Sequence, residues 1–424
     1  MNDKRFKTAF HVVDRRAGMV AEELPLLSVS QYRGVIPRSE LMGDEGRAAD
    51  LSNYKVCDPG DIVLNRMSAY NGAVGLANLR GVVSPDYLVM RPNVGYDGKY
   101  LTYLIRSSWF VSEMSRRVKG IGSIDSGAVR TPRIGASELG DIRVRLPCLS
   151  QQEVVADFLD RETAQIDAFI AKNEELISLV SERRAAVVAH AITKGLEAGI
   201  PMVQSGVAWI GESPPHWTVQ RLASTVTLSR NGIWGTDPDG GADDIRCIRV
   251  ADFDRPRQRV HDANRTLRKV TASEREGRVV RAGDLLLEKS GGGEKSPVGF
   301  AVLYDREELA VCSNFVARIV LAPGMEPRFW THVHGTMYRL RLTERSLKQS
   351  TGIQNLDQAA YFNELAPVPP LNEQAAIADY LDQHSAKIDV ALETARRAID
   401  LARERRAALI SAAVTGKIDM GVSK

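Results

Sequence analysis

Arginine is the residue type in this sequence with the clearest chemical potential, because it is concentrated in two stretches. Residues 1–147 contain 21 Lys or Arg, 16 of them Arg, against 16 Asp or Glu. Residues 201–369 contain 22 Lys or Arg, 18 of them Arg, against 20 acidic residues. The planar guanidinium group can bind a phosphate or a guanine edge through two parallel hydrogen bonds. Both stretches are therefore candidates for DNA binding.

The candidate DNA-binding residues are basic, amide and aromatic side chains in polar loops and turns. Arg and Lys would contact phosphates or base edges, and the aromatic rings would stack or wedge. For any single arginine, a solvated surface position or a local ion pair is the alternative. The candidates are Arg66, Tyr70, Asn71, Lys119, Arg130 and Arg133 in the first stretch, and Trp234, Arg255, Arg257, Lys289, Lys295, Lys348 and Gln349 in the second.

The charge of the whole chain is close to balanced. Its 424 residues include 56 Lys or Arg and 53 Asp or Glu, for a formal net charge of +3. Residues 148–200 are acidic, with 5 basic and 9 acidic residues, and residues 370–424 contain 8 of each. Such a balance is not that of a non-specific nucleic-acid binder. The composition, with 44% hydrophobic and 26% charged residues, is typical of a globular protein.

The sequence lacks the motifs of common enzymes and metal sites. The four cysteines form no CxxC pair, which fits a reduced cytoplasmic protein. Gly291–Ser296 has the wrong spacing for a phosphate-binding loop, and His332 and His334 have no cysteine or carboxylate cluster beside them. No signal peptide or membrane span is expected. We therefore expect a binding protein with no catalytic residues, no cofactor and no metal.

One long segment occurs twice in the chain. Residues 149–196 align without a gap to residues 371–418 at an offset of 222, with 18 of 48 positions identical. The preceding stretches also match faintly, as in Gly60-Asp61 against Gly283-Asp284. The chain thus repeats one plan, in which a variable module is followed by a similar helical segment.

The repeated segments are predicted to be long helices. Apolar residues recur at three- and four-residue steps, and this spacing predicts that Phe169 and Leu176 belong to the apolar seam of the first helix. Ser150–Glu153 is predicted to be a capping box, and Gly195 and Gly416 to be helix stops. A single seam on so long a helix requires a partner helix. The residues expected at the helix or subunit interface are Ile166, Val180, Arg184, Ile388, Leu392 and Arg406.

These observations predict an α/β (α+β) fold in duplicate, with a pseudo-two-fold repeat. Two modules, residues 1–147 and 201–369, would be separated by the helices in 148–200 and 370–424. The helices would form an intramolecular antiparallel coiled coil. The alternative is two separate amphipathic helices, each packed on its own module. Expected strands are 61–64, 82–90, 285–287, 299–304 and 315–321, and expected module helices are 99–118 and 327–348.

Three motifs resemble those of the specificity subunits of type I restriction–modification systems. Trp209-Ile210-Gly211 followed by Pro214 and Trp217 resembles the family's entry to a target recognition domain. Thr351–Leu356 and Pro369–Gln374 resemble the start of its conserved helical region, which Thr415–Lys417 closes. The resemblance covers the full length, although the first module lacks the Trp-Ile-Gly entry.

The resemblance implies a non-catalytic subunit that reads a bipartite site on double-stranded DNA. Each module would read one half-site, the helices would fix the spacing, and the chain would dock adenine methyltransferase (modification) subunits and restriction/translocase subunits. Two alternatives stay open: a specificity subunit of a methyltransferase-only complex, and a coiled-coil scaffold whose end modules bind proteins.

Overall fold

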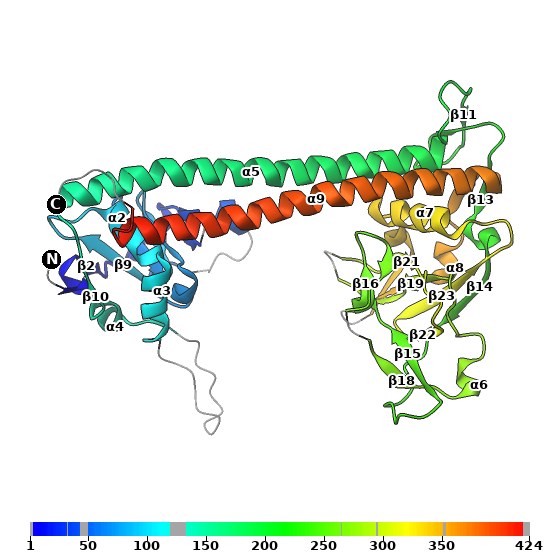
Figure 1. Cartoon of the computed structure of the whole chain (residues 1–424), viewed down its shortest axis with the longest axis horizontal. Coiled ribbons are helices and arrows are strands. Elements are labelled where there is room, and N and C mark those ends of the chain that lie inside the picture. The colour runs from blue at the N-terminus through cyan, green and yellow to red at the C-terminus, as the bar shows by residue number, and fades with distance from the viewer. Residues whose placement is uncertain are drawn as a thin grey trace. The chain divides into compact units, whose positions relative to one another are not determined.

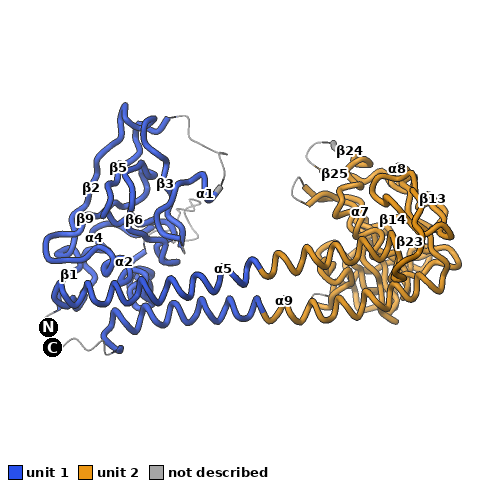
Figure 2. Tube along the Cα trace, turned by 90° about the horizontal axis from the view of Figure 1, so that it is seen from above, with its two compact units in different colours: residues 1–175, 395–424 blue, residues 176–394 orange. Residues whose placement is uncertain are grey.

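A computed structural model describes residues 3–31, 33–42, 50–118, 133–263, 265–293, 296–350 and 353–418 of the chain. The chain divides into two compact units (Figures 1 and 2). Unit 1 comprises residues 1–175 and 395–424, and unit 2 comprises residues 176–394. Each unit combines a module of strands and short helices with part of both long helices.

Unit 1 is built around an antiparallel sheet in the order β2-β9-β6-β7. Helix α2 packs on β7, and the pairs β3–β4, β5–β8 and β1–β10 complete the module. Its strands are β1 (Lys4–Arg5), β2 (Phe10–Val13), β3 (Leu27–Ser30), β4 (Gly34–Pro37), β5 (Lys55–Cys57), β6 (Ile62–Asn65), β7 (Val74–Leu76), β8 (Gly81–Val83), β9 (Tyr87–Pro92) and β10 (Arg143–Val144). Its short helices are α1 (Ser39–Met42), α2 (Gly98–Arg106), α3 (Ser108–Ser115) and α4 (Ala136–Gly140).

Unit 2 repeats this arrangement in a larger sheet of order β14-β23-β19-β21-β17-β16. Its first four strands correspond to β2-β9-β6-β7, and α7 packs on β21 as α2 packs on β7. The strands are β11 (Val203–Gln204), β12 (Glu212–Ser213), β13 (Thr218–Arg221), β14 (Val226–Asn231), β15 (Asp244–Ile248), β16 (Phe253–Asp254), β17 (Arg259–Val260), β18 (Leu267–Lys269), β19 (Leu285–Glu288), β20 (Ser290–Gly291), β21 (Ala301–Leu303), β22 (Ala310–Cys312), β23 (Val316–Leu321), β24 (Leu347–Ser350), β25 (Ile353–Leu356) and β26 (Leu365–Val368). The short helices are α6 (Ala272–Arg275), α7 (Pro327–Arg339) and α8 (Gln358–Tyr361).

The expected module elements are found, but both helices and the strand runs 82–90 and 299–304 are shorter than predicted or split, and 299–304 is reduced to β21. The run 82–90 is split into β8 and β9 by a turn, and the helix expected over 99–118 is split at Ser107, whose hydroxyl caps α3. The helix expected over 327–348 ends at Arg339, and Arg341 beyond it has a positive φ of 58°. Local caps and this left-handed residue therefore end helices that the apolar pattern alone would extend.

The two long helices are α5 (Leu149–Lys194) and α9 (Leu371–Val414), and both contribute to each unit. Gly195 and Gly416 follow their last turns with φ of 78° and 70°, as predicted for helix stops. In unit 1, Arg406 pairs with Asp167 and Arg403 with Glu174, so the helices run antiparallel. The structure confirms two long helices paired in antiparallel.

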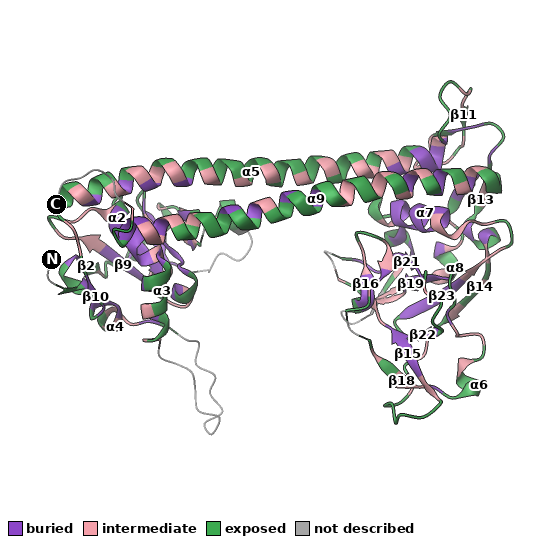
Figure 3. Cartoon of the chain, viewed as in Figure 1, coloured by how far each residue is buried: buried purple, intermediate pink, exposed green. Residues whose placement is uncertain are grey.

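Equivalent positions of the two helices pack into the two module cores (Figure 3). Ala156 and Leu159 of α5 are buried in the unit 1 core, and their equivalents 222 residues further on, Ala378 and Leu381, are buried in the unit 2 core. The other helix of each pair does the same, with Val188, Ala191 and Ile192 in unit 2 and Ile410, Ala413 and Val414 in unit 1. The sequence repeat therefore encodes the same helix-to-module packing twice.

The apolar seam of α5 differs from our assignment at two positions. Phe169 is 47% exposed and Leu176 is 49% exposed, whereas the neighbouring Ile170 and Ile177 are half-buried. The α9 residues equivalent to Ile170 and Ile177 are Leu392 and Ile399, and both are buried. The assignment of Phe169 and Leu176 to the seam was wrong, because a hydrophobic residue one position away satisfies the same helical spacing.

Candidate nucleic-acid interface

A buried glutamine fastens the start of each long helix to its module. Gln152 Nε2 donates to the Pro147 carbonyl, and its Oε1 accepts the N–H of Asp97, the N-cap of α2. Gln374 repeats these contacts with the Pro369 carbonyl and the N–H of Glu326, and it also accepts from Trp330 Nε1.

The predicted capping box at Ser150 is not formed, because α5 already begins at Leu149. The sequence pattern that marks the glutamine junction is Pro-x-Leu-x-x-Gln, which occurs at Pro147–Gln152 and again at Pro369–Gln374. Each amide satisfies buried backbone groups at a helix junction, and leaving such groups without a partner would be costly.

The repeated Gly-Asp pair is a structural motif of both modules. Asp284 accepts the backbone N–H of Arg281 at 2.7 Å and pairs with Arg318 Nε at 2.7 Å. In unit 1, Asp61 accepts the N–H of Asp58 at 2.8 Å and pairs with Arg91 Nε at 2.7 Å. The motif therefore holds a turn against the neighbouring strand, and the Arg318 and Asp284 side chains are only 8% and 7% exposed.

The tryptophan motif of the second module anchors the chain before β13. Trp209 Nε1 donates to the Leu365 carbonyl at 3.0 Å, and Trp217 Nε1 donates to Glu373 Oε2 at 2.9 Å. His216 Nε2 lies 2.8 Å from the other oxygen of Glu373, in the first turn of α9. The motif thus ties the module entry to β26 and α9.

A pocket of about 480 Å³ opens on unit 2 where four segments meet at one edge of its sheets. It is lined by Trp234 after β14, residues 249–251 after β15, Glu288 at the end of β19 with residues 290–292 beyond it, and residues 313–315 between β22 and β23. Trp234 is 39% exposed and Phe315 is 45% exposed. Arg268 lies over the Trp234 ring with Cζ 4.6 Å from its centroid, so one ring face is already occupied.

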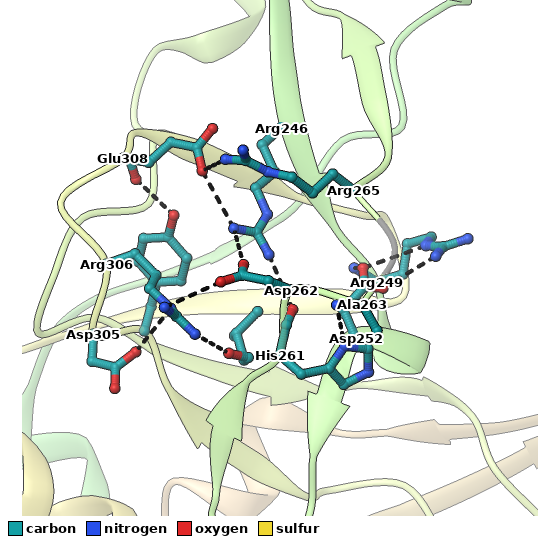
Figure 4. A network of polar contacts seen from close by, with 12 residues as sticks. Arg246, Arg249, Asp252, His261, Asp262, Ala263, Arg265, Asp305, Arg306 and Glu308 are labelled. Carbon is teal, nitrogen blue, oxygen red and sulfur yellow. Dashed lines mark hydrogen bonds and ion pairs between the residues drawn. The ribbon is translucent and has the colours of Figure 1, made fainter.

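Arginines beside this pocket are held by carboxylates. Arg249 pairs with Asp252, and Arg246 pairs with Asp262 at 2.8 Å and Glu308 at 3.3 Å (Figure 4). The Arg246 side chain is only 3% exposed, so this arginine is part of the module's internal packing. The side chain of Arg249 is 34% exposed and remains accessible to a ligand.

The predicted contact residues of unit 2 lie in different surroundings. Trp234 lines the pocket, and the half-buried Lys289 lies between two of its lining residues. Arg255 pairs with the buried Glu288 at 2.7 Å and lies over the Phe300 ring, while Arg257 pairs with Asp254 and with Asp389 of α9. The side chain of Lys348 on β24 is 75% exposed and pairs with Asp357, the N-cap of α8. Lys295 lies outside the described residues, as does the side chain of Gln349.

The predicted contact residues of unit 1 that the structure describes lie around the loop after β6. Tyr70 is 47% exposed and Asn71 is exposed in this loop. Arg66 Nε donates to the Ile134 carbonyl, and Arg133 lies 3.8 Å from Asp86 with 60% of its side chain exposed. Lys119 and Arg130 lie outside the described residues.

The predicted interface residues lie on the paired helices. Arg184 of α5 pairs with Asp389 of α9 at 2.8 Å in unit 2, and Arg406 of α9 pairs with Asp167 of α5 at 2.9 Å in unit 1. These two ion pairs are equivalent under the 222-residue offset. Leu392 is buried, and Ile166, Val180 and Ile388 are half-buried.

The two histidines of α7 are buried in unit 2. Burial lowers the pKa of His332 to about 3 and that of His334 to about 4, so both rings are neutral near pH 7. His334 Nδ1 lies 2.7 Å from the Tyr361 hydroxyl. Within the described residues, no cluster of three or more potential metal-ligating side chains and no helix able to span a membrane are found.

No family model matches the chain. In sequence it is 22% identical over 330 residues to the type I restriction enzyme StySPI specificity subunit from Salmonella potsdam, covering 78% of this chain and 67% of that protein. In structure it matches a chain from a study of complex assembly and conformational transition of the type I restriction–modification system. This match has a TM-score of 0.67 and 14% identity, and covers 98% of both chains.

The chain resembles a type I restriction specificity subunit. The HsdS subunit from Thermoanaerobacter tengcongensis also aligns over 98% of this chain and 97% of its own, with 14% identity and a TM-score of 0.47. The likeness to the first solved structure covers both modules and both long helices, so it extends to the whole duplicated plan.

We predict that Arg255→Gln lowers the stability of unit 2 by about 2 kcal/mol at pH 8, because it leaves a buried carboxylate without its counter-charge. Burial raises the pKa of Glu288, and Arg255 opposes this rise. A carboxyl whose folded pKa is raised stabilises the fold most at low pH, and that contribution is lost as pH rises through the folded pKa. The deficit of the variant should therefore shrink as pH falls.

Denaturant unfolding followed by tryptophan fluorescence measures this effect, because Trp209, Trp217, Trp234 and Trp330 lie in unit 2. Adding Glu288→Gln to the variant should abolish the pH dependence of the deficit. A deficit that is the same at pH 8 and pH 5 would show that Glu288 does not depend on Arg255.

Proposed function

We propose that this chain is the non-catalytic DNA-sequence specificity subunit of a type I restriction–modification complex. The observation that carries the proposal is the duplicated plan. One scaffold occurs twice, with the same glutamine junction, Gly-Asp motif and helix packing, and the chain shares its whole fold with a chain of the type I system. The sequence relative is named as a type I restriction specificity subunit.

In this proposal residues 1–147 and 201–369 are two target recognition domains, and 148–200 and 370–424 are the helical regions that connect them. Each domain reads one half of a bipartite site on double-stranded DNA. Tyr70, Asn71, Arg133, Trp234 and Lys348 are the described candidates that are most available for such contacts, since each is exposed or lines a pocket. Arg255 and Arg257 are better explained by their pairs within unit 2.

The proposed partners are adenine methyltransferase subunits and restriction/translocase subunits, and the proposed location is the cytoplasm. The small net charge of +3 fits this arrangement. Base-edge contacts choose the site, and the partner subunits contribute phosphate contacts.

Affinity purification of the tagged chain from its own organism tests the proposal. We expect an adenine methyltransferase subunit to co-purify, and the complex to bind duplex DNA with an affinity that falls steeply with salt. Recovery of a methyltransferase without a nuclease would favour the methyltransferase-only complex. A complex with no affinity for DNA would contradict the proposal and favour the protein-binding scaffold.

A further inference from the structure

The pocket of unit 2 presents one arginine in a fixed orientation. The Arg249 backbone N–H donates to Asp252 Oδ2 at 2.8 Å, its Nη2 lies 3.1 Å from Oδ1, and its Nε lies 3.4 Å from Oδ2 (Figure 4). Asp252 is only 2% exposed. Because the carboxylate holds the Nε–Nη2 edge, the guanidinium loses little conformational freedom when its remaining donors bind a ligand.

The rest of the pocket suits the edge of a base pair. Trp234 and Phe315 are exposed aromatic side chains that can make apolar contacts, such as those made to the methyl group of thymine. Gly291 and Gly292, with φ of 112° and 58°, line it without side chains, so a ligand can approach the backbone closely. The pocket therefore combines a fixed cation, apolar surface and accessible backbone.

The duplicated scaffold gives an independent comparison. The parallel pairing of Leu26 with Val82 in unit 1 matches that of Cys247 with Val311 in unit 2. Leu26 is therefore equivalent to Cys247, and two residues further along each chain segment Ser28 occupies the position that Arg249 has in unit 2. The same scaffold thus carries a short neutral side chain in one module and a clamped cation in the other.

The second side of the pocket differs between the modules as well. The bridge between Val280 and Ala310 in unit 2 matches the pairing of Cys57 with Gly81 in unit 1, so Gly81 is equivalent to Ala310. Counting on along the chain from this pair, Asp86 occupies the position that Phe315 has in unit 2. Pocket positions therefore change in size and charge while the strand pairing around them is kept. Two modules that read different half-sites need this combination of a shared framework and different contact side chains.

We infer that this pocket is the base-reading surface of unit 2, and that Arg249 determines one base of the half-site that unit 2 reads. A guanidinium fork fits the O6 and N7 acceptors of guanine, so guanine is the base assigned to Arg249. The inference rests on the proposed function, and it adds the residue and the base chemistry that would carry specificity in one module.

The test uses the full chain in complex with its methyltransferase subunit and a pool of randomised DNA duplexes. Bound duplexes are sequenced for the wild type, Arg249→Gln, Arg249→Lys and the control Arg221→Gln, which removes an exposed arginine on β13 outside the pocket lining. Thermal melting of each variant shows whether it is folded.

We expect the wild type and Arg221→Gln to select the same bipartite sequence. Both Arg249 variants should lose about 10-fold or more of the preference for guanine at one position of one half-site, with the other half-site unchanged. Lysine should not restore that preference, because its ammonium group cannot donate two parallel hydrogen bonds to one base edge.

Two results would overturn the inference while leaving the proposed function intact. In one, Arg249→Gln selects the wild-type sequence with undiminished preference at every position. In the other, it weakens binding equally for all sequences and Arg249→Lys restores it, which is the behaviour of a phosphate contact. A wild-type complex that selects no bipartite sequence would instead overturn the proposed function together with the inference.

Discussion

Replacing residues 1–147 with the first module of a type I restriction specificity subunit is expected, under the proposed function, to change one half of the recognised DNA sequence and leave the other half unchanged. The reason lies in how the module is attached. Its contacts with the long helices use the buried Gln152 junction and equivalent packing positions that recur in unit 2. A new module that supplies the same junction keeps the scaffold while changing the surface. The readout is the methylated motif of cells expressing the chimaera.

The reciprocal replacement of residues 201–369 is the matched control, and it should change the opposite half of the motif. Each graft must keep the residue at the N-cap of α2 or α7 whose backbone N–H donates to Gln152 or Gln374. A buried amide left without this partner would destabilise the junction. If either graft changed both halves, or a folded chimaera changed neither half, the modular account would be wrong.

Arg318→Gln is expected to destabilise unit 2 by about 3 kcal/mol or more, because it leaves Asp284 buried and charged without its partner. Both side chains of the pair are less than a tenth exposed, and Asp284 also holds the turn that begins β19. The midpoint of denaturant unfolding, followed by tryptophan fluorescence, measures the loss.

The equivalent arginine of unit 1 provides the comparison. Arg91 pairs with Asp61 in the same motif, and 42% of the Arg91 side chain but only 1% of the Asp61 side chain is exposed. Arg91→Gln should therefore cost about 2 kcal/mol, less than Arg318→Gln because water reaches the exposed arginine, but not negligible because Asp61 stays buried without its counter-charge. It should leave the fluorescence transition of unit 2 unchanged. Equal costs for the two substitutions would show that the exposure of the arginine does not set the strength of this repeated pair.

The helices and the repeat were predictable because their signals are long and redundant. The repeat at an offset of 222 residues located the first residue of both long helices and came within four residues of their last residues, and the glycines at 195 and 416 marked their ends. The seam was less certain in detail. Phe169 and Ile170 both satisfy helical spacing, and only the geometry of the paired helices buries Ile170 rather than Phe169.

The candidate site was predictable only in part, because exposure and pairing are properties of the folded chain. Trp234 was identified as a candidate and lines the pocket, whereas Arg255 looked like a DNA contact and instead neutralises the buried Glu288. Phe315 reaches the pocket only because segments far apart in the sequence meet through strand pairing. The Asp252 clamp on Arg249 is local, but it forms only in the short turn that follows β15. The roles of Gln152 and Gln374 became clear only from the junctions they fill.

A map of adenine methylation in the genome of the organism that carries this gene, compared with a strain lacking it, tests the central claim most directly. The account predicts that one motif, made of two short defined blocks separated by a fixed undefined gap, is methylated in the first strain and unmethylated in the second. Unchanged methylation after deletion, or loss of a single continuous motif, would contradict the claim that two modules read two half-sites.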